Sequence, residues 1–457
     1  MRLSTVCPND KKQLPFLKFY DIMPINFESG DKMSVLIVAP PLFDGKMTIK
    51  AHKMCDYNPS IHLDTKNDFR GKSQIYYMPG LELIQKIGLD PFSGDLQLFV
   101  DVNRFHILTG MFTNKNIPPE KLILVIPSDI DADNDLLTGL KGLKDLGYSM
   151  ALDGYPKDGL NNPMFFYTDY IIFDYGDKNF NAQYNEVKKT SNDITIVISN
   201  IPSKEAYNKL SSAKNTLFTG VFYKNPVTES ESIEISPLKV NALQLLKHIS
   251  EEDYELKDIV KTIERDPALS ISLLSFINTS GGLKNKVSSI NNAVAYLGQK
   301  EVRRWATVAV SIGLSKDKPG EITKLSLVRA KFAENLAGLF ELGIYKNSLF
   351  MTGLFSMLDL ILDKPMEQAV NDVAIDDLVR ETLLSQSGRL YKVMELIYNY
   401  ERADWNKVSI FIIQNNLDGG LVGQAYIDAL VWYHQLLTSI EESSNTDEDL
   451  PDLPKDK

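Results

Sequence analysis

The sequence contains few of the residues that form cross-links and transition-metal sites. Its 457 residues include two cysteines, Cys7 and Cys55, and five histidines dispersed along the chain. Two cysteines exclude a disulfide framework and are typical of a reducing compartment. The stretch from His52 to Cys55 has the composition of half a metal site, but no second Cys or His cluster would complete it. We therefore expect no zinc site.

Long apolar runs and an excess of positive charge are also absent. No segment approaches about 18 consecutive apolar residues, the length of a membrane-spanning helix, and the N-terminus lacks the apolar run of a signal peptide. The net charge is -11 and no long basic stripe is present, which argues against nucleic acid as the main partner. We expect a cytoplasmic protein that binds neither membranes nor nucleic acid.

The overall composition is that of a folded protein of more than one domain. With 44% hydrophobic and 24% charged residues, the chain can bury a core, and its length predicts two or three domains. The end of the chain differs. Residues 441–457 contain seven acidic residues and two lysines, a charge of -5, which predicts an acidic disordered tail.

After an N-terminal extension (1–33), residues 34–226 alternate short apolar runs with amphipathic segments. In one such segment Leu136, Leu140 and Leu143 share a helical face, and Gly147 follows the helix. The predicted strands are residues 34–40, 96–102, 122–127, 149–155, 170–176, 194–200 and 217–223. Such units predict a parallel α/β fold, and seven or more of them favour a closed barrel over an open sheet.

A polar linker (227–237) separates this half from residues 238–440, which have helical periodicity throughout. One predicted helix buries Ile259 and Ile263. Another buries Ile290 and Val294, and its predicted end is Gly298. The second half is therefore predicted to be an all-α domain.

Two stretches of this helical half carry a resemblance to a known family. RDPALSISLLSFINTS (265–280) and VSSINNAVAYLGQKEVRRW (287–305) resemble the signature of HDOD domains, which keep the helical fold of HD-type hydrolases. The His-Asp pair that binds metal in those hydrolases would fall at Ser356 and Met357. Neither is a useful ligand for a divalent metal, so the resemblance implies no HD-type phosphohydrolase activity.

The first half resembles the EAL domain, a barrel that hydrolyses cyclic di-GMP in its active members. The matching pieces are VAPPLFDGK (38–46), FVDVN (99–103), LKDLGYSMALDGY (143–155), TDYIIFDYG (168–176) and LFTGVFYKNP (217–226). The whole chain is thus similar to EAL–HDOD hybrid signalling proteins. The predicted fold is a TIM-like α/β barrel of the EAL type followed by an all-α HDOD domain.

Active EAL domains hold divalent metals with carboxylates and an asparagine, assisted by a lysine. By position, three acidic residues remain from such a site: Asp101, Asp153 and Asp174. Six positions carry a residue that departs from the family pattern: Lys53 (in place of the glutamate that names the family), Val125, Gly154, Ile172, Pro202 and Thr219. The resemblance therefore predicts no catalytic residue, no metal site, no cofactor and no enzymatic activity.

The leading hypothesis is a non-catalytic bacterial signalling protein that acts through protein–protein interactions, in motility, biofilm formation or a related response. One alternative is a receptor that binds cyclic di-GMP without hydrolysis, although the family's nucleotide-contacting arginine would fall near Tyr57 and no arginine is there. A second alternative is a metal-dependent cyclic di-GMP phosphodiesterase. No oligomeric state is predicted.

The stretch KEVRRW (300–305) is a candidate interaction surface. Arg303 and Arg304 are of the type enriched at such surfaces, whereas Trp305 with Val302 and Ala306 makes an ordinary buried stripe. We expect Trp305 to be buried and the two arginines to face solvent.

Overall fold

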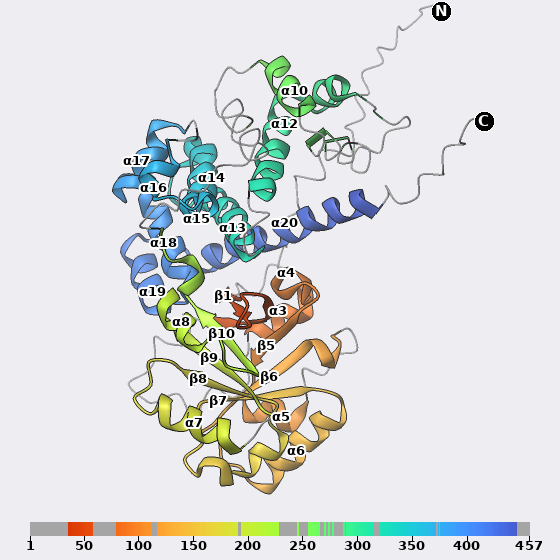
Figure 1. Cartoon of the computed structure of the whole chain (residues 1–457), viewed down its shortest axis with the longest axis vertical. Coiled ribbons are helices and arrows are strands. Elements are labelled where there is room, and N and C mark those ends of the chain that lie inside the picture. Colours follow the sequence, from red (N-terminus) through yellow and green to blue (C-terminus); the bar gives the residue numbers. More distant parts are fainter. Residues whose placement is uncertain are drawn as a thin grey trace, which may run out of the picture. The chain divides into compact units, whose positions relative to one another are not determined.

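The computed structural model describes most of both halves of the chain (Figure 1). The described residues are 35–57, 79–110, 117–190, 193–227, 245, 255–265, 269–270, 273–274, 277, 287, 289–314, 320–371, 373 and 375–445. The predicted N-terminal extension, the linker after Val227 and residues 446–457 of the predicted tail lie outside them. Residues 441–445, predicted to begin the disordered tail, are instead the last residues of a helix.

In the described part of the chain, eight strands close into a barrel, in the order β10-β2-β3-β5-β6-β7-β8-β9. The strands are β1 (Leu36–Val38), β2 (Pro41–Phe43), β3 (Ile49–Lys53), β4 (Cys55–Tyr57), β5 (Gln97–Asp101), β6 (Leu122–Pro127), β7 (Ser149–Asp153), β8 (Tyr170–Asp174), β9 (Thr195–Ile201) and β10 (Thr216–Gly220). From β3 through β10, neighbouring strands of the barrel are parallel. The predicted α/β barrel is confirmed.

The start of the barrel differs from the prediction. The run 34–40 is predicted as a barrel strand, but β1 pairs antiparallel with β4 in a separate two-stranded sheet. The barrel instead begins with β2, which runs antiparallel to both β3 and β10. The prediction missed two barrel strands. The three residues of β2 are too few to show an alternation of side chains, and the sequence of β3, IKAHK, is not an apolar run.

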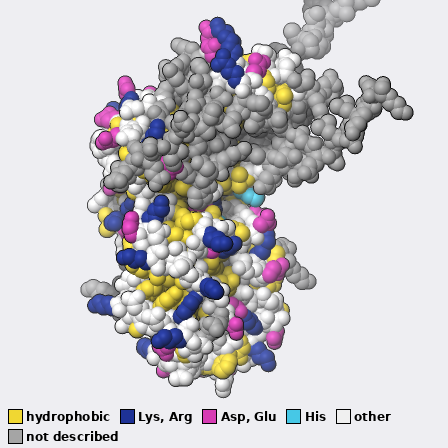
Figure 2. Space-filling model, viewed as in Figure 1, with side chains coloured by type: hydrophobic (Ala, Val, Ile, Leu, Met, Phe, Trp, Pro, Cys, Tyr) yellow, Lys and Arg dark blue, Asp and Glu magenta, His cyan; other side chains and the backbone are white. Residues whose placement is uncertain are grey.

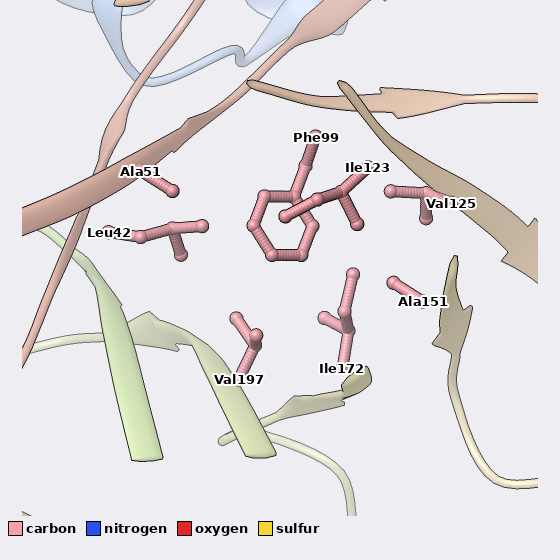
Figure 3. Close-up of a cluster of buried hydrophobic side chains, with 8 residues drawn as sticks. All are labelled: Leu42, Ala51, Phe99, Ile123, Val125, Ala151, Ile172 and Val197. Carbon is pink, nitrogen blue, oxygen red and sulfur yellow. The ribbon is translucent and has the colours of Figure 1, made fainter. Parts of the chain in front are cut away.

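The lumen of the barrel is filled by side chains that point toward one another from seven strands (Figure 3). They are Leu42, Ala51, Phe99, Ile123, Val125, Ala151, Ile172 and Val197, each at most 2% exposed. The small side chains of Ala51 and Ala151 leave room for the ring of Phe99, as dense packing requires. The barrel is therefore solid below its rim.

Helices and short 3₁₀ turns connect the strands. They are α3 (Pro79–Ile87), α4 (Asp90–Ser93), α5 (Arg104–Thr109), η1 (Pro119–Lys121), α6 (Asn134–Asp145), η2 (Gly159–Asn161), η3 (Pro163–Tyr167), α7 (Phe180–Thr190), α8 (Lys204–Leu210) and η4 (Phe222–Lys224). The predicted face of α6 is confirmed, because Leu136, Leu140 and Leu143 are all buried. Asp133 caps the start of this helix, and Gly147 follows its end with φ +93°.

The second half is helical, as predicted. Its elements are α10 (Leu256–Glu264), α12 (Ile290–Leu314), α13 (Gly320–Leu336), η5 (Gly343–Tyr345), α14 (Lys346–Phe355), α15 (Leu358–Leu362), α16 (Met366–Ala369), α17 (Asp377–Ser385), α18 (Tyr391–Glu401), α19 (Trp405–Gln414) and α20 (Gly419–Asn445). Ile259, Ile263, Ile290 and Val294 are buried. At Gly298 the backbone leaves the helical conformation, with φ +74°, so α12 is kinked where its first part was predicted to end.

The chain divides into two compact units, and the division does not coincide with the linker. Residues 31–234 form one unit together with 311–434, whereas 235–310 belong to the other. Within the first unit, α18 and α20 pack directly on β1. The backbone N–H of Ile37 donates a hydrogen bond to Tyr400 Oη at 3.0 Å, and a Cβ on Gly423 would lie only 2.0 Å from the carbonyl oxygen of Val35.

The close approach at Gly423 predicts that a larger residue there destabilises the protein, whereas helix propensity alone would predict that alanine stabilises it. Gly423→Ala should lower the free energy of unfolding by about 1 to 3 kcal/mol, because backbone must move to admit the methyl group. Chemical denaturation followed by circular dichroism measures the effect.

Gly142→Ala in α6 is the matched control. Nothing lies within 4 Å of the added Cβ there, so this change should stabilise the protein by about 0.5 to 1 kcal/mol. Equal effects of the two substitutions would contradict the packing of α20 on β1.

Candidate functional site

Charged side chains follow the carboxyl ends of four barrel strands. Lys53, Asp101, Asp153 and Asp174 are the last residues of β3, β5, β7 and β8. Because these strands are parallel, their carboxyl ends meet at one rim of the barrel, which is where functional groups of α/β barrels are found. The acidic residues predicted from the sequence are therefore at one end of the barrel, together with one of the predicted losses, Lys53.

Lys53 and Asp101 form an ion pair at this rim. Lys53 Nζ lies 3.6 Å from Asp101 Oδ1, and the two side chains are 16% and 43% exposed. Burial opposes the charged form of Lys53, but the acidic groups around it, Asp101 first and Asp153 among them, together outweigh burial and raise the pKa of Lys53 above its ordinary value. Burial also raises the pKa of Asp101, against the effect of Lys53 and together with that of Asp153.

One oxygen of this pair has unused capacity. Asp101 Oδ1 is buried, yet it accepts no hydrogen bond from the described residues. Its distance to Lys53 Nζ is longer than a direct hydrogen bond, a spacing at which a water or a ligand atom commonly completes the contact. One carboxylate oxygen at the rim is therefore without a hydrogen bond from the described residues.

Two further ionisable groups follow Lys53, and the prediction missed both as rim residues. Burial raises the pKa of the Cys55 thiol to about 11, so it is protonated at neutral pH. Burial, and then the charge of Asp101, raise the pKa of Asp56 to about 6, while the backbone N–H of Gly80 donates to Asp56 Oδ2 at 2.7 Å. The clue in the sequence was their position, two and three residues beyond a strand end.

Two of the positions predicted to have lost a site residue carry apolar side chains that pack in the lumen of the barrel. Val125 and Ile172 are 1% and 2% exposed and belong to the cluster that fills the lumen (Figure 3). Along the strands they are in register with Asp101 and Asp153, respectively. The apolar side chains at these two positions complete the core. A side chain that bound a ligand would instead have to face the rim.

The remaining predicted positions lie at or near the ends of strands β7 to β10. Gly154 has φ +87° and donates its N–H to the carbonyl of Ile172. Pro202 is exposed after β9, and Thr219 is buried in β10. Asp174 accepts hydrogen bonds from Gly176 N at 2.7 Å and from Asn200 Nδ2 at 2.8 Å. The last pair of contacts fixes the loop after β8 and engages both carboxylate oxygens of Asp174.

Metal binding of the kind that the EAL resemblance implies does not fit these residues. Within the described ranges, no three His, Cys, Asp or Glu side chains are placed to hold one ion. The ammonium of Lys53 already supplies a positive charge beside Asp101, at the position of an expected carboxylate ligand. No catalytic step through a metal follows from this arrangement.

His52, the other candidate ligand beside Cys55, takes part in a different contact. It is buried, and its Nε2 lies 3.3 Å from Lys324 Nζ and 3.7 Å from Glu321 Oε2, both on α13. Burial and the charge of Lys324 lower the pKa of His52. His52 therefore joins the barrel to the helical half.

In the helical half, an arginine contacts Ser356, the first of the two positions at which the HD resemblance places a metal ligand. Ser356 follows α14 and accepts a hydrogen bond from Arg329 Nη1 at 2.7 Å. Arg329 also donates from Nε and Nη2 to the two carboxylate oxygens of Glu401, at 2.8 and 2.6 Å. Met357, at the second expected position, is a core residue that is 3% exposed.

The Arg329–Glu401 pair is almost fully buried, with side chains 4% and 6% exposed. Burial opposes the charge of Arg329, but the bidentate carboxylate outweighs it and raises the pKa of Arg329 above its usual value. Each charge depends on the other, because an unpaired buried ion is strongly destabilising.

The candidate interaction surface of α12 is placed only in part. Arg303 and Arg304 belong to this helix, but their side chains lie outside the described residues. Trp305 is 6% exposed beside the fully buried Val302 and Ala306, so the prediction that it is a core residue is confirmed.

The surface charge is mixed on the face drawn in Figure 2. Over the barrel, Lys and Arg side chains are separated by apolar and uncharged surface and interspersed with Asp and Glu. Within the described ranges, every helix is too short or too polar to cross a bilayer.

Comparison with known proteins identifies the helical half. Residues 235–379 match the family model of the HDOD domain. The chain is 27% identical over 418 residues to the uncharacterized protein YuxH of Bacillus subtilis, covering 89% of this chain and 99% of that protein. It is also 27% identical over 320 residues to the cyclic di-GMP phosphodiesterase CdgJ of Vibrio cholerae, covering 69% and 74%.

Solved structures similar to the barrel include EAL proteins. An EAL domain protein from Listeria monocytogenes is 16% identical with a TM-score of 0.30, covering 42% of this chain and 88% of that one. The EAL enzyme Bd1971, bound to cAMP and cyclic-di-GMP, is 12% identical with a TM-score of 0.33, covering 42% and 62%.

The chain is a barrel protein that carries an HDOD domain. It is similar to the EAL–HDOD hybrid proteins, as predicted, and is related to proteins of cyclic di-GMP signalling.

One prediction is contradicted. The chain was expected to have no enzymatic activity, but the similar protein CdgJ is a cyclic di-GMP phosphodiesterase. The prediction compared positions one at a time along the strands. It left out Asp56, a carboxylate that the fold brings to the same rim and whose pKa of about 6 suits acid–base chemistry.

The raised pKa of Asp56 predicts a pH-dependent stability. The folded-state pKa of about 6 lies above the value of about 3.9 for an unfolded aspartate. The stabilisation by the bound proton is therefore complete below about pH 4 and is lost as the pH rises through about 6. Asp56→Asn should raise the free energy of unfolding by about 2 kcal/mol at pH 7.5 and hardly at all at pH 4.

Denaturation at the two pH values measures this difference. Asn keeps an acceptor oxygen for the N–H of Gly80. Asp95→Asn is the control, since that side chain is fully exposed and loses only a surface ion pair with Lys121. A gain from Asp56→Asn that is the same at both pH values would argue against a protonated buried carboxyl.

The buried ion pair predicts a second stability effect. Glu401→Gln should lower the free energy of unfolding by about 3 kcal/mol, because it leaves Arg329 charged and unpaired in the core. Replacing both residues, by Arg329→Met with Glu401→Leu, should cost less than Glu401→Gln alone.

Lys50→Ala breaks the exposed pair with Asp44 and is expected to cost less than about 1 kcal/mol. If the double replacement proved as destabilising as the two single changes added together, the two charges would not depend on each other.

Proposed function

We propose that this chain is a cyclic di-GMP signalling protein that binds the nucleotide at the carboxyl-end rim of its barrel and transmits the bound state to a protein partner through its HDOD domain. The observation that supports the proposal is the rim cluster of Lys53, Asp56, Asp101 and Asp153. Three of these groups, Lys53, Asp56 and Asp101, have shifted pKa values. Such groups gathered at one end of a barrel are typical of a functional site.

The chemistry of the cluster suits a guanine nucleotide. Lys53 provides a charged ammonium for a phosphate oxygen. Asp101 Oδ1 accepts no hydrogen bond from the described residues, and the Asp101 side chain is 43% exposed, so its carboxylate is the proposed acceptor for the N–H groups on the edge of guanine. The acidic neighbours limit the affinity for phosphate alone, so the base and the phosphate have to be recognised together.

Hydrolysis of cyclic di-GMP is the second candidate function. Similarity to the phosphodiesterase CdgJ favours it. So does Asp56, because a carboxyl with a pKa of about 6 can exchange a proton near neutral pH.

The proposal extends to the cellular role. The HDOD domain would bind a protein partner in the cytoplasm, and the response would be motility, biofilm formation or a related behaviour. The proposed boundaries are 34–226 for the barrel domain, 227–237 for the linker and 238–440 for the HDOD domain.

Calorimetry with the full chain tests binding. We expect saturable binding of cyclic di-GMP, weakened about tenfold or more by Lys53→Ala through loss of a charge-assisted contact. Lys50→Ala is the matched control, because Lys50 lies on the same strand with an exposed side chain and should leave the affinity unchanged.

Incubation with Mg²⁺ or Mn²⁺ and chromatography of the products test hydrolysis. A linear dinucleotide product that disappears in Asp56→Asn would support the second candidate. Absence of both heat and product at high micromolar cyclic di-GMP would refute the proposal.

A further inference from the structure

A pocket lies where the end of β4 faces the turn between α18 and α19. It has a volume of about 530 Å³ and is lined by Tyr57, Ala403, Asp404, Trp405 and Asn406. All five belong to the compact unit that contains the barrel and the helices from α13 onward. The pocket is therefore built jointly by the barrel half and the helical half.

Two aromatic rings form one wall of this pocket. The rings of Tyr57 and Trp405 are stacked, with centroids 6.0 Å apart and planes 14° from parallel. Trp405 meets Tyr400 edge to face at 5.3 Å, and Tyr400 is in turn held by the hydrogen bond from Ile37. These two rings, which stack on each other and are called the Tyr57–Trp405 platform below, are thus held in place before any ligand arrives. Such preorganisation lowers the entropic cost of binding.

The rim of the pocket is polar and carries both signs of charge. Asp404 caps α19 by accepting from Lys407 N at 3.2 Å and pairs with Lys407 Nζ at 2.7 Å. The hydrogen bond from Lys407 and the charge of Arg402 hold the pKa of Asp404 below its ordinary value. Its carboxylate keeps lone pairs for further donors, and the two cations can attract an anion.

The turn that presents these groups has an unusual backbone. Ala403 has φ +53°, a left-handed conformation that normally favours glycine. Its N–H donates to Tyr400 O at 2.9 Å, and that of Asp404 donates to Asn399 O at 3.1 Å. These bonds end α18 and place Asp404 and Trp405 side by side on the pocket.

We infer that this pocket binds a purine base, specifically a guanine, which stacks on the Tyr57–Trp405 platform and donates its N–H groups to Asp404. Purine rings stack on aromatic side chains. A carboxylate, which only accepts hydrogen bonds, is complementary to the N–H edge of guanine and not to that of adenine. An anionic ligand is tolerated here because Arg402 and Lys407 flank the carboxylate.

The inference rests on the proposed function in one respect. Tyr57 lies four residues beyond Lys53, at most about 13 Å along an extended backbone. A dinucleotide bound at Lys53 could therefore place one of its bases in the pocket. The helical half would then contact the ligand itself, and the bound state would be read by α19.

Calorimetry on the full chain, with guanosine and with cyclic di-GMP as separate probes, tests the pocket. Trp405→Ala should weaken both ligands about tenfold or more, while Trp405→Phe, which keeps an aromatic face, should stay within about threefold of the wild type. Asp404→Asn keeps the helix cap and should reduce the preference for cyclic di-GMP over cyclic di-AMP at least tenfold.

Tryptophan fluorescence gives an independent readout. Guanosine should quench the emission of the wild type and of Trp432→Phe, a tryptophan that packs elsewhere on Phe350, but not that of Trp405→Phe. Retention of quenching in Trp405→Phe would overturn the inference.

The outcomes separate the pocket from the rim. If cyclic di-GMP binds Trp405→Ala and Tyr57→Ala as it binds the wild type, but binds Lys53→Ala weakly, the pocket inference fails and the proposed function stands. If guanosine binding depends on Trp405 while Lys53→Ala leaves cyclic di-GMP binding unchanged, the pocket stands and the rim proposal fails. If only an aromatic peptide binds, the pocket takes a protein side chain and the inference is overturned.

Discussion

Close packing inside the barrel is the constraint on which the rim depends. A closed sheet must fill its lumen, and here branched side chains and one phenyl ring do so up to the level of Val125 and Ile172. Val125 and Ile172 are in register with Asp101 and Asp153, so β6 and β8 contribute apolar side chains beside the acidic ones. The strand ends therefore decide which residues are available, and Lys53, Asp101 and Asp153 are those that the strands present.

Both halves of the chain hold a fixed cation at or beside a position where the sequence resemblance predicts a metal ligand. In the barrel it is the ammonium of Lys53 beside Asp101, and in the helical half it is the guanidinium of Arg329 between Ser356 and Glu401. A side-chain cation neutralises nearby carboxylates without the several oxygen ligands that a divalent ion requires. A side-chain cation also remains in place at every metal concentration. The charges at these two positions are therefore neutralised by folding itself.

Local pattern predicted much of the fold and part of the site. The face of α6, the break at Gly298 and the strands β5 to β10 each have a signal within a few residues, such as helical spacing, a glycine or a dense apolar run. Asp101 and Asp153 belong to such runs, whereas Lys53 was located only through the resemblance to the EAL domain, because its strand, β3, was not predicted. The pairing of β1 with β4, by contrast, is set by contacts with α18 and α20, far along the chain. For the same reason, neither Tyr57 nor Trp405 indicates on its own that the two rings stack.

The packing of β1 bears on how the protein can be divided. Leu36, Ile37 and Val38 are at most 5% exposed, and among the described residues β1 has only β4 as a strand neighbour. Cutting the chain between barrel and HDOD domain would uncover three adjacent apolar residues on an open strand, which is the geometry that recruits other strands and leads to aggregation. The barrel domain, although its sheet is closed, therefore depends for its solubility on helices that lie near the other end of the chain.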